Sequence, residues 1–197
     1  MRMFWTRLEG ETGHEAAYAL LEQLVGTPLP PIRRTELGKP YFADGDLHFS
    51  ISHTENHAFC CVSNRNIGID AEEIGRRVDL RLADRFLSPY EKAMFDTAAD
   101  KQDCLLRLWV LKESYAKRTG RGVGNYLKST DFSPDDPRIQ IIDGCAVAVM
   151  EEEKIDSNFS LALCWAWKYV APPVRQRPQA AMASPGGKLS RNANCIS

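Results

Sequence analysis

A helical stretch followed by short strands occurs twice in this 197-residue chain, and this repetition constrains the fold most strongly. Residues 13–25 carry apolar side chains at helical spacing, and the alternating segment 46–52 then predicts a strand. Residues 104–118 form the second predicted helix, and 138–150 predicts two strands around a turn at Asp143–Gly144. We therefore predict an α+β fold in which two helix-on-antiparallel-sheet halves pack together.

We expect three sections along the chain. Residues 1–67 would form the first α+β half, and residues 68–171 the second. Residues 172–197 contain four basic residues, four prolines and no acidic residue, without hydrophobic periodicity. This composition predicts a disordered tail.

Composition narrows the class of protein. A hydrophobic content of 44% and a charged content of 26% are ordinary for a soluble globular protein. The formal net charge of −1 gives no reason to expect nucleic acid or a membrane as partner. Because no apolar run approaches the roughly 20 residues of a membrane span and the N-terminus lacks a signal-peptide core, we expect a cytoplasmic protein. The six cysteines show no metal-binding spacing and are expected to be buried free thiols.

Two acidic side chains lie close together in the segment GIDAE, residues 68–72. Side chains two apart on a strand point the same way, about 7 Å apart, so Asp70 and Glu72 share a side. Like charges in that arrangement repel unless they are solvated, paired with basic groups or neutralised by a cation. A solvated strand end is the simplest of these alternatives.

The segment 109–122 adds a glutamate within a basic cluster. On a helix, Trp109, Glu113 and Lys117 share one face. An exposed Glu113–Lys117 pair, worth about 0.2–0.5 kcal/mol, explains those two residues but not the surrounding cations. The remaining cations are Lys112, Arg118 and Arg121.

The predicted helix at 104–118 and the segment 68–72 together suggest a site for a cation and phosphate groups. Asp70, Glu72 and Glu113 would form an all-oxygen anionic site of the kind that Mg²⁺ favours. The neighbouring lysines cannot bind a cation, but they suit phosphate groups that a cation would bring. The sequence therefore predicts a metal-bound, nucleotide-like pyrophosphate substrate.

His53 at the end of a predicted strand has two interpretations. It is either a structural, hydrogen-bonded residue or a phosphate contact, and we favour the second. No serine or cysteine pairs with it as a nucleophile, which argues against a hydrolytic triad. The other histidines, His14, His48 and His57, receive no role. The chain contains neither a P-loop nor a dinucleotide-binding glycine motif.

Four ordered motifs carry a resemblance to a known family. They are Gly38-Lys39-Pro40, Ser50-Ile51-Ser52-His53-Thr54, Gly68-Ile69-Asp70-Ala71-Glu72, and Trp109 through Gly120 with its W-x-x-K-E core. Each motif alone is weak, but their order and spacing together are specific. In these residues the chain resembles the 4′-phosphopantetheinyl transferases, of the type that activates surfactin synthetase.

The resemblance implies a fold, an activity and roles for residues. The fold would be two α+β halves related by a pseudo-twofold axis, with coenzyme A in the cleft between them. The enzyme would transfer the phosphopantetheine arm to a serine of an apo acyl or peptidyl carrier protein and release adenosine 3′,5′-bisphosphate. The metal ligands for Mg²⁺ would be Asp70, Glu72 and Glu113, with Glu113 also the general base. The residues that would contact coenzyme A are Lys39, Ser52, His53, Asp70, Lys112 and Lys117, and Lys117 would also assist catalysis.

The chain departs from the family near its start. The early basic contacts to the nucleotide have no clear counterpart, and Arg33 or Arg34 would substitute for them. We expect a monomer with internal pseudo-symmetry. Two alternatives remain: a Mg²⁺-dependent phosphohydrolase or nuclease that uses the same carboxylates, and a non-catalytic module that binds coenzyme A or a carrier protein.

Overall fold

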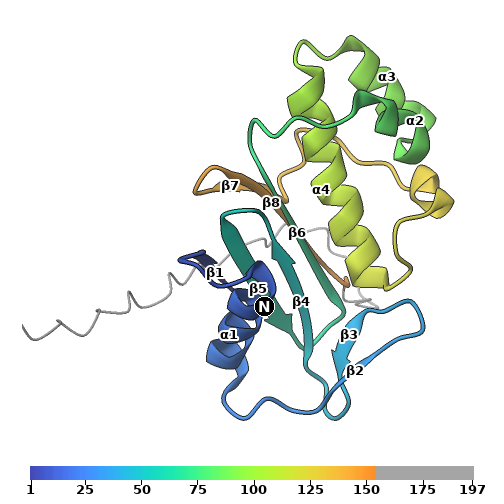
Figure 1. Ribbon diagram of the computed structural model, residues 1–197. Coiled ribbons are helices and arrows are strands. Elements are labelled where there is room, and N and C mark those ends of the chain that lie inside the picture. The colour runs from blue at the N-terminus through green and yellow to red at the C-terminus, as the bar shows by residue number, and fades with distance from the viewer. Residues whose placement is uncertain (154–197) are drawn as a thin grey trace, which may run out of the picture.

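The computed structural model describes residues 1–153, apart from the side chain of Asn125, and combines helices and strands in an α+β arrangement. Two three-stranded antiparallel sheets are each accompanied by a long helix (Figure 1). The helices and strands in chain order are β1 (Arg2–Arg7), α1 (Gly13–Val25), β2 (Ile32–Arg34), β3 (Pro40–Phe42), β4 (His48–His53), β5 (His57–Ser63), β6 (Ile67–Glu73), α2 (Ala83–Phe86), α3 (Pro89–Thr97), α4 (Lys101–Thr119), β7 (Ile139–Ile142) and β8 (Cys145–Glu151). Short 3-10 helices span Leu80–Leu82 and Asn125–Ser129.

The first sheet has the strand order β1-β5-β4, and α1 packs on it. Residues Leu20, Leu21 and Leu24 of the helix are buried against Phe49 of β4 and Val62 of β5. Their spacing of one, three and four residues places them on one helix face, as the sequence predicts. This face forms the hydrophobic core of the first half.

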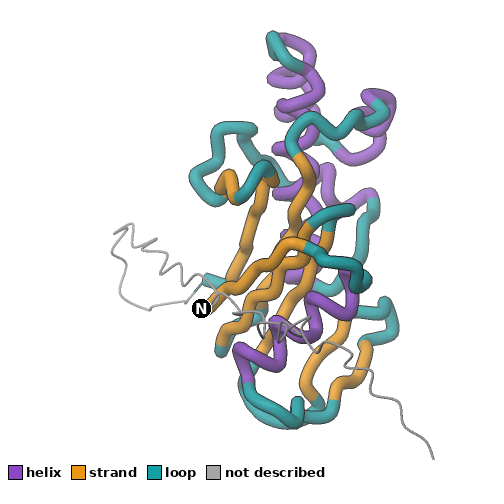
Figure 2. Tube along the Cα trace, turned by 60° about the vertical axis from the view of Figure 1, so that its left-hand side comes forward, coloured by secondary structure: helices purple, strands orange, loops and turns teal. Residues whose placement is uncertain are grey.

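The second sheet has the order β6-β8-β7, and α4 lies along β6 and β8. Leu105, Leu108 and Leu111 of α4 are fully buried in a cluster that includes Ala148 of β8 and residues from α2 and α3. Figure 2 shows α2 and α3 at one end of the molecule, beyond the strands. Within residues 1–153, these two helices thus extend the α4 cluster at that end of the molecule.

A third buried cluster joins the two sheets. It contains Phe59 and Cys61 of β5 together with Ile67, Ile69 and Val147 of the second sheet. Odd-numbered residues of β6 thus face this cluster, so the even-numbered ones face α4. This alternation places the side chains of Asp70 and Glu72 on the α4 side of the sheet.

Identifiable caps set the helix boundaries. A capping box at Ser88 and Glu91 begins α3, and Gly120, at φ 70°, ends α4. The helix starts at Lys101 rather than at residue 104, because the Asp100 side chain accepts hydrogen bonds from the first-turn amides of Gln102 and Asp103. Its polar first turn has no apolar periodicity to reveal it.

Two further turns complete the comparison with the sequence. The turn between β7 and β8 is the predicted one, with positive φ at both Asp143 and Gly144. Residues 32–42 form the small β2–β3 hairpin, for which no strand was predicted. The end of the predicted second half, residues 154–171, and the tail predicted for 172–197 lie outside the described residues.

Two expectations from composition concern burial and membranes. Cys60, Cys61, Cys104 and Cys145 are buried and free, as expected. Within residues 1–153, every helix is too short or too polar to cross a bilayer.

Helix α4 approaches the sheet closely at Gly68 of β6. A Cβ atom at this position would lie 2.0 Å from the carbonyl oxygen of Ser114 and 2.4 Å from the amide nitrogen of Arg118. Both are backbone atoms of α4 and cannot rotate away. Only glycine lets the helix dock at this distance, which brings Glu113 and Lys117 toward the carboxylates of β6.

We predict that Gly68→Ala destabilises the protein by about 3 kcal/mol or more, because overpacking against rigid backbone costs at the upper end of its usual range. Gly124→Ala is the matched control, since a Cβ there would meet only the Tyr126 ring at 3.6 Å. Urea unfolding monitored by circular dichroism measures both. Equal stability of the two variants would contradict the docking described for Gly68.

Candidate active site

A groove between the two sheets collects the polar residues that the motifs predicted. Its larger cavity has a volume of about 1010 Å³, and a smaller one of about 240 Å³ shares Ile51, Glu113 and Lys117 with it. The larger cavity is lined by Ser52, His53, Asp70, Glu72, Glu113 and Lys117. Residues from all four motifs thus line one groove, with Lys39 reaching the smaller cavity.

One carboxylate oxygen joins three structural elements. The Lys117 ammonium on α4 donates to Oδ1 of Asp70 at 2.7 Å, and the Ser52 hydroxyl on β4 donates to the same oxygen at 3.0 Å. Lys117 also donates to the Ser52 hydroxyl oxygen at 3.1 Å. Asp70 is 6% exposed, so solvent screens this ion pair less than a surface pair.

The other oxygen of Asp70 is in a different situation. Oδ2 is shielded from solvent and has no hydrogen-bond partner among the described residues. A buried carboxylate oxygen without a partner is costly unless a donor or a cation reaches it. This oxygen is therefore the point of the site at which a cation fits best.

Glu113 lies beside Asp70 and is held in a partly buried position on α4. Burial, and then the negative charge of Asp70, raise the pKa of Glu113 to about 7, against the opposing effect of Lys117. A carboxyl group with a pKa near neutrality is divided between its acidic and basic forms at physiological pH. Glu113 is thus suited to accept a proton during a reaction.

The three predicted metal ligands line one cavity but do not form a closed cluster. Glu72 pairs with Arg76, while Asp70 is bonded to Lys117. Among residues 1–153, no three histidine, cysteine, aspartate or glutamate side chains are close enough to hold a metal ion as they stand. The predicted triad of Asp70, Glu72 and Glu113 remains a prediction.

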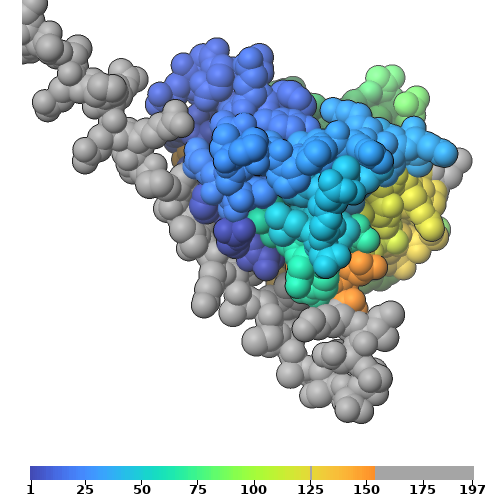
Figure 3. All heavy atoms as spheres, turned by 90° about the horizontal axis from the view of Figure 1, so that it is seen from below, coloured from blue at the N-terminus to red at the C-terminus, as the bar shows by residue number. Residues whose placement is uncertain are grey.

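His53 and Lys39 lie at the borders of the groove. The His53 ring packs against Gly13 at the start of α1, where a Cβ would lie 2.6 Å from the ring. The Lys39 ammonium donates to the carbonyl of Arg118 at 2.7 Å, and burial lowers the pKa of Lys39. Figure 3 shows the first half, in blue, beside the yellow end of α4. Lys39 therefore connects the β2–β3 hairpin to the second half.

Arg33 is not brought into the site. It is exposed on β2, and it lines neither of the two cavities of the groove among the described residues. Its strand neighbour Ile32 packs against the hydrophobic core of the first half. The structure gives no support for Arg33 as a nucleotide contact.

Lys112 requires a correction. Its ammonium is fully buried and lies 2.7 Å from a carboxylate oxygen of Glu91 on α3. It also donates to the backbone carbonyls of Leu127 at 2.6 Å and Thr130 at 2.5 Å. All three donors are engaged on the side of α4 away from the groove, so Lys112 cannot contact phosphate in this structure. It anchors the segment that follows α4.

Further polar residues around the carboxylates were not predicted from the sequence. Arg76 pairs with Glu72, and Glu73 lines the larger cavity. His57, which received no role, is buried among acidic side chains of the second half. A histidine on an otherwise apolar strand was the available signal, but its partners lie far away in the sequence.

Carboxylates, lysines and a serine around one groove suit chemistry on phosphate esters, because such transfers depend on positioning and on stabilising negative charge. The chain belongs to the 4′-phosphopantetheinyl transferase superfamily, whose family model matches residues 66–170. The family resemblance read from the four motifs is thereby confirmed.

Curated relatives agree with this membership. The chain is 35% identical over 112 residues to 4′-phosphopantetheinyl transferase gsp of Aneurinibacillus migulanus, covering 56% of this chain and 46% of the relative. It is 34% identical over 137 residues to a 4′-phosphopantetheinyl transferase of Bacillus subtilis, covering 66% and 61%. It is 29% identical over 137 residues to 4′-phosphopantetheinyl transferase Sfp of Bacillus subtilis (strain 168), with the same coverage. The chain thus spans about half to three fifths of the length of these relatives.

We predict that Lys112→Met lowers the free energy of unfolding by about 3–5 kcal/mol, because it leaves the buried Glu91 carboxylate without its cation. Lys128→Met is the control, since Lys128 is exposed and donates only to the Asp84 carbonyl. Urea denaturation measures both variants. A loss for Lys112→Met no larger than that for the control would contradict the buried ion pair.

A second prediction concerns pH and Glu113 in protein freed of divalent cations. Since the pKa of Glu113 is about 7 in the folded state against an ordinary value of 4.5, ionisation favours unfolding. Its cost is absent below about pH 4.5, grows as the pH rises and is complete above about 7. Glu113→Gln should therefore be more stable than the wild type at pH 8, by about 1–2 kcal/mol after allowance for solvent screening.

Thermal melting at pH 4.5 and pH 8 in the presence of a chelator tests this. Glu22→Gln, on the exposed side of α1, is the matched control and should show no such pH-dependent gain. An equal effect of both substitutions at pH 8 would contradict the raised pKa.

Proposed function

We propose that this protein transfers the 4′-phosphopantetheine arm of coenzyme A to a serine hydroxyl of an apo acyl or peptidyl carrier protein. Adenosine 3′,5′-bisphosphate is the second product. The observation that carries the proposal is the groove in which Lys117, Ser52 and Asp70 meet beside a glutamate with a pKa of about 7. Family membership and the names of the relatives support it.

Glu113 activates the nucleophile. A serine hydroxyl is a weak nucleophile at neutral pH, and a nearby carboxylate can take its proton as it attacks. The serine oxygen forms a bond to the β-phosphorus of coenzyme A. The bond from that phosphorus to the bridging oxygen breaks, and adenosine 3′,5′-bisphosphate leaves with the electron pair.

Basic residues of the groove stabilise the charge that develops on phosphate. Lys117 projects from α4 into both cavities, and its ammonium lies within reach of Asp70 and Ser52. His53 and Lys39 border the same groove at its two sides. Together they orient the pyrophosphate and compensate negative charge on the leaving group.

The chemistry of the groove suits a Mg²⁺ ion. Oδ2 of Asp70 is buried and accepts no hydrogen bond from residues 1–153, and the carboxylates of Glu113 and Glu72 line the same cavity. These three side chains would hold the ion, since Mg²⁺ binds few carboxylates and keeps water and phosphate oxygens as further ligands. When bound, it would neutralise charge on the phosphoryl oxygens.

The two halves fit the proposed architecture. Residues 1–67 and 68–171 would be related by a pseudo-twofold axis, with the active site between them. The support is that each half has a three-stranded antiparallel sheet and one long helix within the described residues. The groove takes Ser52 and His53 from the first half and its carboxylates from the second.

The decisive experiment incubates the protein with coenzyme A, Mg²⁺ and a panel of apo carrier proteins, followed by intact-mass analysis. We expect a carrier to gain the mass of phosphopantetheine at its serine. Release of inorganic phosphate or cleavage of nucleic acid without a modified carrier would favour a phosphohydrolase or nuclease instead. Binding of coenzyme A without either product would favour a binding module.

We predict that Glu113→Gln lowers single-turnover transfer by about 10²–10⁴-fold, the usual contribution of a general base. Coenzyme A should still bind in calorimetry, because Lys39, His53 and Lys117 are unchanged. Glu22→Gln serves as control and should transfer normally. Transfer by Glu113→Gln at the wild-type rate would remove Glu113 from the mechanism.

A further inference from the structure

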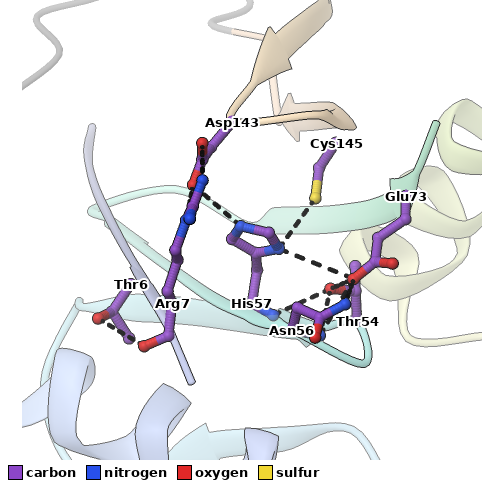
Figure 4. Close-up of polar contacts among 8 residues, drawn as sticks. All are labelled: Thr6, Arg7, Thr54, Asn56, His57, Glu73, Asp143 and Cys145. Carbon is purple, nitrogen blue, oxygen red and sulfur yellow. Dashed lines mark hydrogen bonds and ion pairs between the residues drawn. The ribbon is translucent and has the colours of Figure 1, made fainter. Parts of the chain in front are cut away.

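His57 is a first-half residue whose side chain makes polar contacts with the second half. It lies at the start of β5 and is 7% exposed. Its Nε2 atom is 3.0 Å from Oδ2 of Asp143 in the β7–β8 turn, and its Nδ1 atom is 3.4 Å from the Cys145 sulfur (Figure 4). Oε1 of Glu73 on β6 lies 3.8 Å from Nδ1. We call His57, Asp143, Cys145 and Glu73 the histidine clasp.

Both ring nitrogens of His57 have polar partners in the second half. Nε2 faces Asp143, and Nδ1 faces the Cys145 sulfur and Glu73. Burial raises the pKa of the Cys145 thiol to about 11, so the sulfur keeps its hydrogen. The ring also contacts Trp5 and Phe59, with centroids 6.0 and 6.2 Å away.

The order Cys145–His57–Asp143 resembles the arrangement of a nucleophilic triad, but the clasp is not one. Cys145 is fully buried, and a nucleophile must be both accessible and readily ionised. Arg7 of β1 also forms a two-point ion pair with Asp143, as Figure 4 shows. The arrangement therefore serves to hold segments together.

The far side of the clasp holds the turn between β4 and β5. Oε1 of Glu73 accepts hydrogen bonds from the Thr54 hydroxyl at 2.9 Å, the Asn56 amide at 3.0 Å and the Asn56 side chain at 2.9 Å. Thr54 directly follows His53, and Glu73 directly follows Glu72. The clasp thus ties together the two strand ends that bring His53 and Glu72 to the groove.

We propose that His57 is a positioning residue of the transfer reaction. Through Asp143 and Glu73 it fixes the end of β4 relative to the end of β6, and so fixes His53 relative to the carboxylates of the groove. Side chains that support a metal or phosphate site from outside tune its affinity even when they touch no ligand. This inference rests on the proposed function, because it assigns His57 a part in that reaction.

His57→Phe is the informative substitution. It keeps a ring against Trp5 and Phe59 but removes both hydrogen bonds. His57→Gln keeps an N–H group that can donate to Asp143 and should recover much of the wild-type behaviour. If His57→Phe does not fold, Asp143→Asn carries the test, since it removes the charge of the clasp at constant size.

The chain offers a matched control at the opposite end of the same strand pair. Arg65 pairs with Glu151, and Glu151 lies opposite Ile67 where β6 and β8 begin to pair. Glu73 lies opposite Cys145 at the other end. Arg65→Gln therefore removes a contact between similarly distant segments, but away from His53 and the carboxylates.

Two readouts separate positioning from stability. The first is the Mg²⁺ concentration for half-maximal single-turnover transfer, which should rise on the order of tenfold in His57→Phe. The second is hydrogen exchange of the Asn56 amide, which should accelerate in His57→Phe without Mg²⁺ or coenzyme A. Arg65→Gln, compared at the same interval below its melting temperature, should change neither.

The outcomes are distinct. Both changes in His57→Phe, with recovery in His57→Gln, would support the proposal. An unchanged Mg²⁺ requirement, or one that rises equally in Arg65→Gln, would overturn it while the wild type still modifies its carrier. A wild-type protein that modifies no carrier would overturn the proposed function itself, and this inference with it.

Discussion

The contact between the Lys117 ammonium and Asp70 joins the helix and the strand on which the groove depends. At 2.7 Å, and with Asp70 almost fully buried, the pair is far less screened than an ion pair on the surface. Ser52 adds the first half through the same oxygen. Removing Lys117 would leave a buried carboxylate without a cation, which proteins tolerate poorly. One oxygen thus holds three elements in register and orients the second, unpartnered oxygen.

The groove could be predicted from sequence where local periodicity decides orientation. A strand repeats every two residues and a helix every 3.6, so GIDAE had to present Asp70 with Glu72, and α4 had to present Glu113 with Lys117. These four residues do line one cavity. Ser52, which only the family resemblance assigned to the site, lines the same cavity. The α+β class was predicted from the same strand and helix repeats.

Other features depend on partners that are distant in the sequence. Lys112 is next to Glu113, but 100° of helical rotation turns it away from the groove toward Glu91, 21 positions earlier in the chain. No local sequence pattern indicates such a pair, so the positive charge of Lys112 was assigned to phosphate binding. His57 shows the same difficulty, because Asp143 lies 86 positions later. The family resemblance located Lys112 in a motif, but a motif does not say which way a side chain points.

Because Gly68 has no side chain, it also affects how the second half folds. Helix and strand cannot slide past each other gradually, because a shift of β6 by one residue would press the Cβ of Ile67 or Ile69 into the backbone of α4. The same shift would turn Asp70 and Glu72 into the apolar cluster between the sheets. Misaligned docking is therefore penalised twice, by collision and by burial of charge. Gly68 therefore restricts docking of β6 on α4 to one register, in which the carboxylates face the groove. In a shifted register the second half does not assemble.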